Sequence, residues 1–190
     1  MGLVLNRIKP EYKEQDLTAE LWDWGKSLLI ALVVVILTNQ FIATQCLVIG
    51  YSMQPTLVQG ERLLINRFIY KFRAPHRGEI ITFADPDLTQ SKPIKNLIKR
   101  VIAIPQDVVE IRAGLLYLNG DLIHEAYIDS DIKDGDWGPY TVQADQLFVM
   151  GDNRHAHASR DSRTFGVVSK KLIVGRAEAV LWPFKKINWL

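Results

Sequence analysis

Apolar and charged positions divide this chain into two parts. No charged residue occurs from position 27 to position 60, and this gap contains the apolar run S-L-L-I-A-L-V-V-V-I-L. A helix needs about 20 residues to cross the apolar core of a bilayer. Residues 27–47 provide that length, so the pattern predicts one transmembrane helix there. The preceding residues 1–26 would then form a short cytoplasmic segment.

Two alternatives for the apolar run stay open. A cleaved signal peptide has a shorter run and a small-x-small cleavage site, and the exit I-A-T-Q-C-L-V contains no clear A-x-A. A buried core helix is the other alternative, because the strictly apolar part, residues 28–37, is short. Trp22 and Trp24 favour the anchor, since aromatic residues gather at membrane interfaces. The basic residues before the run favour an N-terminus on the inner side.

From residue 48 onward the pattern is that of β-strands. Segments such as E-I-I-T-F, V-V-E-I, L-L-Y-L and Q-L-F-V-M are short and rich in β-branched or aromatic residues, and turn signals separate them. Asn-Gly at 119–120, between two such segments, predicts a tight hairpin. The pattern therefore predicts that residues 48–190 form one mainly β domain, attached to the membrane by a single helix.

Composition narrows the function classes. Basic and acidic residues nearly balance, 23 against 21, so we expect no nucleic acid partner. The single cysteine, Cys46, excludes an internal disulfide and a cysteine-rich zinc site. His155 and His157 share one loop, but no third metal ligand is evident in the sequence. We expect neither a metal nor a cofactor.

The stretch I-G-Y-S-M-Q-P-T-L places Ser52 directly after the apolar run. A serine hydroxyl is a poor nucleophile until a base takes its proton. Histidine is the usual base, but none of the four stands out: His76, His124, His155 and His157. A lysine can replace it if an apolar pocket lowers its pKa from about 10.4 to near neutrality, a change of about 4 kcal/mol.

Lys99 meets that demand in the pattern N-L-I-K-R-V-I-A-I. Strand alternation places Leu97, Lys99 and Val101 on one face. Spacing alone leaves two other interpretations open. A lone lysine in a strand is usually a solvent-facing residue, and Gly-x-Ser is a common tripeptide.

Four segments, taken together and in order, resemble one family. They are S-M-Q-P-T-L at 52–57, R-G-E-I-I-T-F at 77–83, I-K-R-V-I-A-I-P-Q-D at 98–107 and G-D-N-R…S-R-D-S-R-T-F-G at 151–166. Beside a predicted membrane span, they resemble the type I signal peptidases, the membrane-anchored serine–lysine endopeptidases. The resemblance implies a mostly β catalytic domain on the extracytoplasmic side.

The resemblance also implies roles for individual residues. Ser52 corresponds to the nucleophile and Lys99 to the general base. Ser159 corresponds to a serine that hydrogen-bonds the lysine and orients it. The remaining positions are Gly50 and Met53 for oxyanion and substrate binding, and Arg100, Asp161 and Arg163 for structural support near the site.

The sequence departs from the family pattern at three places. Gly50 stands where some members have a serine whose hydroxyl assists the oxyanion. Gln106 replaces a turn glycine, so this turn must avoid a positive φ or tolerate strain. The loop at 155–158 is two residues longer than usual, and it precedes Ser159.

The resemblance implies removal of N-terminal signal peptides from exported preproteins, which would bind as extended strands. Preproteins and membrane lipid are the expected partners, and the enzyme is expected to be a monomer in the plasma membrane, or in a thylakoid membrane if cyanobacterial. One alternative is an inactive anchored paralogue that binds signal peptides or partner proteins. Another is a self-cleaving serine–lysine regulator.

Overall fold

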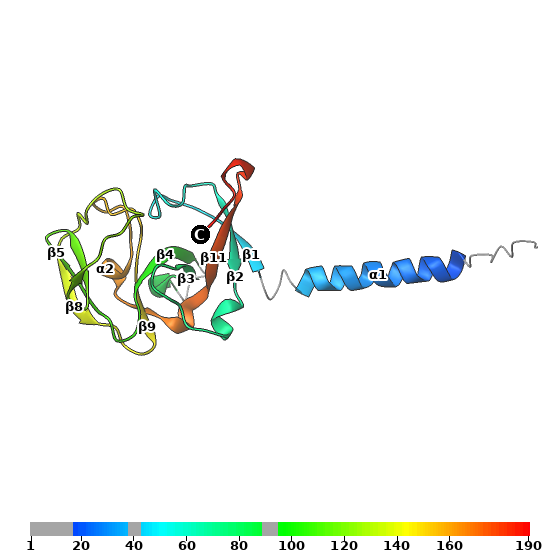
Figure 1. Cartoon of the computed structure of the whole chain (residues 1–190), viewed down its shortest axis with the longest axis horizontal. Coiled ribbons are helices and arrows are strands. Elements are labelled where there is room, and N and C mark those ends of the chain that lie inside the picture. The colour runs from blue at the N-terminus through cyan, green and yellow to red at the C-terminus, as the bar shows by residue number, and fades with distance from the viewer. Residues whose placement is uncertain (1–16, 38–42, 89–94) are drawn as a thin grey trace, which may run out of the picture. The chain divides into compact units, whose positions relative to one another are not determined.

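The computed structural model describes residues 17–37, 43–88 and 95–190. The chain forms two units, residues 1–38 and residues 39–190. The described part of the first unit, residues 17–37, is a helix, and the second unit is a β-rich domain (Figure 1).

The N-terminal helix is α1, Leu17–Leu37, and its large apolar side chains from residue 28 to 36 are exposed. No helix within the described ranges combines the length and apolar character needed to cross a bilayer. Residues 1–16 of the predicted cytoplasmic segment and residues 38–42 of the predicted span lie outside the described part of the chain.

The predicted span extended too far toward the C-terminus. Ala43–Leu47 forms strand β1, which pairs antiparallel with β2, Arg62–Asn66. The physical reason is the alternation of this segment: Thr44 and Cys46 are partly buried, whereas Gln45 and Leu47 are exposed. A period of two is that of a strand at a sheet surface.

The described residues of the β-rich domain form two antiparallel sheets, which confirms the mainly β prediction. An eight-stranded sheet has the order β1-β2-β11-β3-β4-β9-β10, with β12 also paired to β11. Its further strands are β3 Ile80–Ala84, β4 Asn96–Ala103, β9 Gln146–Met150, β10 Val168–Ser169, β11 Ile173–Trp182 and β12 Asn188–Trp189.

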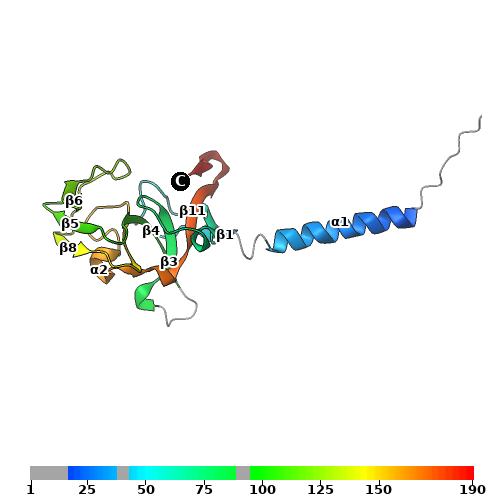
Figure 2. The same cartoon turned by 60° about the horizontal axis from the view of Figure 1, so that its bottom comes forward.

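A smaller four-stranded sheet has the order β7-β6-β5-β8 and lies at the end of the domain away from β1 (Figures 1 and 2). Its strands are β5 Val108–Arg112, β6 Leu115–Leu118, β7 Asp121–Leu122 and β8 Trp137–Thr141. Asn119 and Gly120 both have positive φ and connect β6 to β7. The structure therefore has the hairpin that the Asn-Gly pair predicts.

Short helices complete the described residues. They are α2 Ser162–Phe165 and the 3-10 turns η2 Ile69–Lys71, η3 Pro86–Leu88, η4 Lys170–Leu172 and η5 Phe184–Lys186. Asp161 caps α2, since its side chain accepts a hydrogen bond from the Arg163 N–H.

The apolar core reaches the region of Ser52. Met53 and Leu57 are buried in a cluster with Val48, Leu63 and other residues of the large sheet. These two side chains fix the turn that carries Ser52, because burying such a side chain stabilises its position by about 2 kcal/mol. A second cluster contains apolar residues of β3, β4 and β9, among them Ile81, which lies opposite Lys99 in the sheet.

Candidate active site

The segment after β1 carries Ser52 on a tight turn. Gly50 has φ +91°, a conformation that side-chain-bearing residues rarely adopt. The Leu57 N–H donates to the Met53 carbonyl at 2.8 Å, and the Gln54 N–H donates to the Tyr51 carbonyl at 3.1 Å. Local hydrogen bonds and buried apolar side chains thus hold the turn together.

Lys99 lies in the middle of β4, opposite Ile81 of β3, and only 3% of it is exposed. Its Nζ lies 2.5 Å from Ser52 Oγ, within hydrogen-bonding distance. The two residues are 47 positions apart in the sequence, so the fold brings them together. At this distance a proton can pass between the two side chains, which is the relation that a nucleophile and its base need.

The surroundings of Lys99 favour its neutral form. Burial lowers the pKa of its amine from 10.5 to about 8, against the opposing effect of the Asp161 carboxylate; Arg160 and Arg163 add to the lowering. An amine with such a pKa is a usable general base near neutral pH, because a substantial fraction is unprotonated.

Ser159 is buried beside this pair but has another partner than the resemblance implied. Its Oγ donates to Asp161 Oδ2 at 2.7 Å, and no hydrogen bond joins it to Lys99 among the described residues. Ser159 can lie this close to Ser52 because the residue between them, Gly151, has no side chain. A Cβ at position 151 would lie 2.2 Å from the Ser52 carbonyl oxygen and 2.3 Å from Ser159 Oγ. An orienting role for Ser159 stays a prediction.

Asp161 and Arg163, which the resemblance assigned to structural support, form an ion pair. Arg163 Nε donates to Asp161 Oδ1 at 2.9 Å and Nη2 donates to Oδ2 at 2.8 Å. Asp161 also accepts from the Gly151 N–H at 3.0 Å. Although burial alone would raise the pKa of Asp161, hydrogen bonds and the charge of Arg163 outweigh it and lower that pKa.

Arg100 connects Lys99's strand to a residue that sequence reasoning missed. Its Nε and Nη2 donate to the two oxygens of the fully buried Asp152 at 2.8 and 2.6 Å. Thr56 Oγ1 donates to the same carboxylate at 2.5 Å, and the guanidinium stacks over the Tyr127 ring at 3.9 Å. Asp152 therefore ties the nucleophile turn to β4. Thr56 and Asp152 both stand inside the segments that carried the resemblance.

A groove of about 110 Å³ opens beside the dyad, between residues 46–53 and residues 96–99. Two strand edges border it. β1 is the terminal strand of its sheet, and β9 pairs with β4 only from Arg100 onward. Backbone groups on both sides are thus available to an extended peptide.

Gln106 adopts φ +77°. Of the two outcomes expected for this turn, avoiding a positive φ or tolerating strain, the structure shows the strained one.

The long loop at 155–158 contains no paired-histidine site. His155 Nε2 lies 3.3 Å from Asp129, whereas His157 Nδ1 lies 3.8 Å from Asp134. In the described ranges no group of three or more potential ligands gathers.

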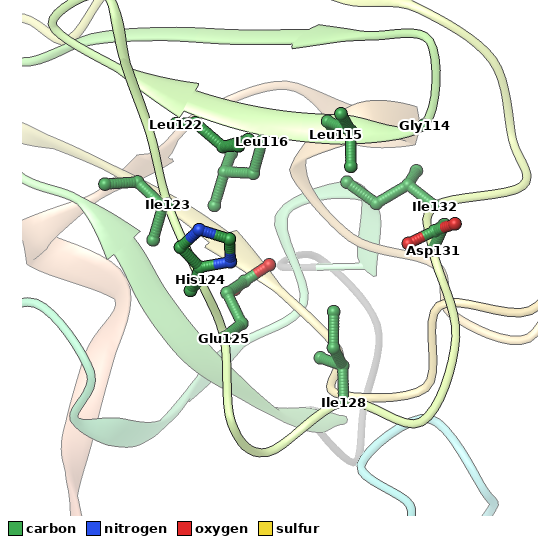
Figure 3. A pocket seen from close by; sticks show the side chains of 10 residues that line it. All are labelled: Gly114, Leu115, Leu116, Leu122, Ile123, His124, Glu125, Ile128, Asp131 and Ile132. Atoms are coloured by element: carbon green, nitrogen blue, oxygen red, sulfur yellow. The ribbon is translucent and has the colours of Figure 1, made fainter.

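Another cavity, of about 170 Å³, lies between the β6–β7 hairpin and the following loop (Figure 3). Most of its lining is aliphatic. The Glu125 side chain reaches it, but that carboxylate is bound by both terminal nitrogens of Arg154 and by the Tyr127 hydroxyl. The lining of this cavity contains no serine, threonine, cysteine or lysine, so it offers no counterpart of the Ser52–Lys99 pair.

Known proteins resemble most of the chain. The family described as "Signal peptidase, peptidase S26" matches residues 21–182. "Signal peptidase I P" of Bacillus subtilis subsp. natto is 37% identical over 186 residues, covering 93% of this chain and 97% of that protein. "Probable signal peptidase I-2" of Synechocystis sp. is 35% identical over 167 residues, covering 87% and 75% respectively. A solved structure of signal peptidase I from Enterococcus faecalis is 29% identical and covers 55% of this chain and 97% of its own, with a TM-score of 0.42.

Proposed function

Because the chain belongs to the signal peptidase family, peptidase S26, we propose that it cleaves signal peptides from preproteins at a membrane with Ser52 and Lys99 as its dyad. The single observation that carries the assignment is the 2.5 Å contact between the buried Lys99 Nζ and Ser52 Oγ. Signal-peptide removal is the activity of the family. The roles of Ser52 and Lys99 as a dyad and the location at a membrane are proposed for this chain.

The mechanism uses Ser52, Lys99, a backbone N–H group and water. Neutral Lys99 accepts the Ser52 proton while Oγ attacks the scissile carbonyl. The Ser52 N–H stabilises the oxyanion, a contribution of about 3 to 4 kcal/mol for one such donor. Lys99 then gives its proton to the leaving amine. Water attacks the acyl-enzyme and restores Ser52.

The groove favours an extended substrate. Residues 46–50 and 96–99 border it with two open strand edges, so a peptide can pair on either side by β-augmentation. Alternate side chains of a strand face the same way. A groove of about 110 Å³ therefore suits small side chains at the first and third positions before the cut.

Membrane attachment belongs to the same proposal. Residues 28–36 of α1 are uncharged and their large apolar side chains are exposed. The catalytic domain exposes Trp182 and Phe184 as well, beside the basic Lys185 and Lys186. Aromatic and basic side chains together favour a membrane interface. We expect a plasma-membrane enzyme with its catalytic domain outside, or a thylakoid location in a cyanobacterium.

Two substitutions test the dyad. Ser52→Ala and Lys99→Met should each abolish cleavage of a preprotein in detergent while leaving thermal unfolding cooperative. Ser130→Ala and Lys133→Met are matched controls, because Ser130 Oγ has no hydrogen-bond partner in the described structure and Lys133 is exposed. Residual turnover above about 1% in either dyad variant would remove the assignment.

The same assay separates the alternatives. A purified wild-type protein that binds a signal peptide but never cuts it would indicate an inactive paralogue. Autoproteolysis at a fixed site, without turnover of added preprotein, would indicate a self-cleaving regulator. For an enzyme of the plasma membrane, protection of the catalytic domain from protease added to spheroplasts would contradict the extracytoplasmic location.

A further inference from the structure

The direction of the Ser52 N–H depends on the peptide group that joins Tyr51 to Ser52. This bond is not among the cis peptides of the described residues. In a planar trans peptide the carbonyl oxygen and the N–H point in opposite directions. A group that holds the Tyr51 carbonyl therefore also aims the Ser52 N–H.

Asn153 holds that carbonyl. Its side-chain Nδ2 donates to the Tyr51 oxygen at 3.1 Å, and its own backbone N–H donates to the Ser52 oxygen at 3.1 Å. One residue thus fixes two consecutive peptide groups of the nucleophile turn. The Gln54 N–H also donates to the Tyr51 oxygen, so two donors from different segments hold this carbonyl.

The Asn153 amide is itself oriented. Its Oδ1 accepts from the His155 N–H at 3.2 Å, which leaves Nδ2, the donor, facing Tyr51. The segment before it is anchored too, because Asp152 is buried and bound by Arg100 and Thr56. Asn153 is therefore a preorganised donor on a fixed segment.

The Ser52 N–H, in contrast, has no acceptor among the described residues. Gly50 supplies no hydroxyl that could share the oxyanion. A free N–H with a fixed direction is what oxyanion stabilisation requires, since its donor must already point at the charge that develops. Loss of that direction should weaken transition-state binding more than substrate binding.

We propose that Asn153 is a positioning residue that aims the Ser52 N–H at the oxyanion through the Tyr51 carbonyl. This inference rests on the proposed signal-peptidase function. Asn153 acts through the peptide group and is not a general acid or base. Its contribution is expected in kcat, with little change in KM.

Two variants test this role. Asn153→Ala removes the donor. Asn153→Asp also removes it but keeps an oxygen for the His155 N–H, so the loop stays attached. Each should lower kcat between about 10-fold and 100-fold, less than the loss of an oxyanion donor itself, with KM within about threefold of wild type. Asn188→Ala, at an exposed position, is the control and should leave both constants unchanged.

A pair of inhibitors separates positioning from general stability. A signal-peptide aldehyde adds to Ser52 Oγ and places an oxygen where the oxyanion forms, whereas the corresponding alcohol binds without that bond. Both Asn153 variants should weaken the aldehyde by the same factor as kcat and leave the alcohol unchanged. An unchanged kcat, or equal weakening of both inhibitors, would overturn the role of Asn153.

Failure of this inference differs from failure of the proposed function. If Ser52→Ala and Lys99→Met are inactive but both Asn153 variants keep full kcat, only the positioning role is wrong. If the dyad variants keep their activity, the oxyanion donor is misassigned, and the proposal for Asn153 is wrong with it.

Discussion

Protonation of Lys99 should control the activity of this enzyme on the acidic side of its pH range. Burial lowers the amine pKa from 10.5 to about 8, and only the neutral amine can accept the Ser52 proton. Activity should therefore depend on the fraction of neutral Lys99. Lowering the pH is the simplest perturbation of that fraction.

The structure gives the size of the effect. A change from 10.5 to about 8 corresponds to about 3 kcal/mol in favour of the neutral form. At pH 7 about one molecule in ten then has a neutral amine, against about one in 3,000 for an ordinary lysine. The value of kcat/KM should fall about tenfold for each pH unit below about 8 and level off above it.

The assay is cleavage of a fluorogenic signal peptide between pH 5.5 and 10. Because kcat/KM reports the free enzyme and kcat the complex, the two profiles should differ. A bound peptide covers the groove and removes more water from Lys99, so the acidic limb of kcat should lie below that of kcat/KM. Lys133→Met controls for the loss of an exposed lysine and should reproduce the wild-type profile.

Two results would contradict this account. A limb near 10 would mean that Lys99 is solvated like an ordinary lysine, and a limb near 6.5 that survives in Lys99→Arg would assign the base to a histidine. A profile without an acidic limb down to pH 5.5 would exclude any amine as the base.

Three further outcomes follow from the structure. Lys99→Met should be inactive, but its free energy of unfolding at pH 7 should be higher than that of the wild type by about 2 to 3 kcal/mol in urea. The reason is that the pKa of Lys99 is lower in the folded than in the unfolded chain, so folding with a charged Lys99 costs free energy. This gain should disappear as the pH rises from about 8 to 10.5. Burial alone would raise the pKa of Glu79, but hydrogen bonds from Arg73 and other donors lower it from 4.5 to about 2; Glu79→Gln should therefore destabilise the protein at pH 7 but not at pH 2, as thermal unfolding at both pH values would show. Gln106→Gly should raise the free energy of unfolding by about 1 kcal/mol in a urea titration with unchanged kcat, because it relieves the residue's positive φ; a loss of stability would mean that Gln106 is unstrained.

The proximity of Ser52 and Lys99 could be predicted because Lys99 interrupts an otherwise apolar strand pattern. A lysine among apolar residues in a strand has either a solvated or a buried position, and the resemblance favoured the buried one. The Asn119–Gly120 hairpin was equally accessible, since its conformation depends on two adjacent residues. Both predictions concern local properties of the chain.

The boundary of the N-terminal helix and the polar contacts around the dyad were harder. Residues 43–47 are uncharged, so hydropathy cannot distinguish a helix end from a strand that pairs with residues 62–66. Asp152 could form an ion pair with any of several arginines, and only the folded structure shows that its partner is Arg100. The partner of Ser159 likewise depends on where Asp161 lies. Tertiary contacts decide these positions.

Among the described residues no strand pairs with the outer edge of β1, and this edge has a consequence for the molecule in solution. Exposed strand edges can recruit other chains, and many proteins prevent this with prolines, charges or bulges along the edge. The strand Ala43–Leu47 has no proline, charged residue or bulge. Any of these features at this edge would obstruct the peptide that binds in the groove. The same opening therefore makes the catalytic domain prone to self-association whenever it is concentrated without a substrate.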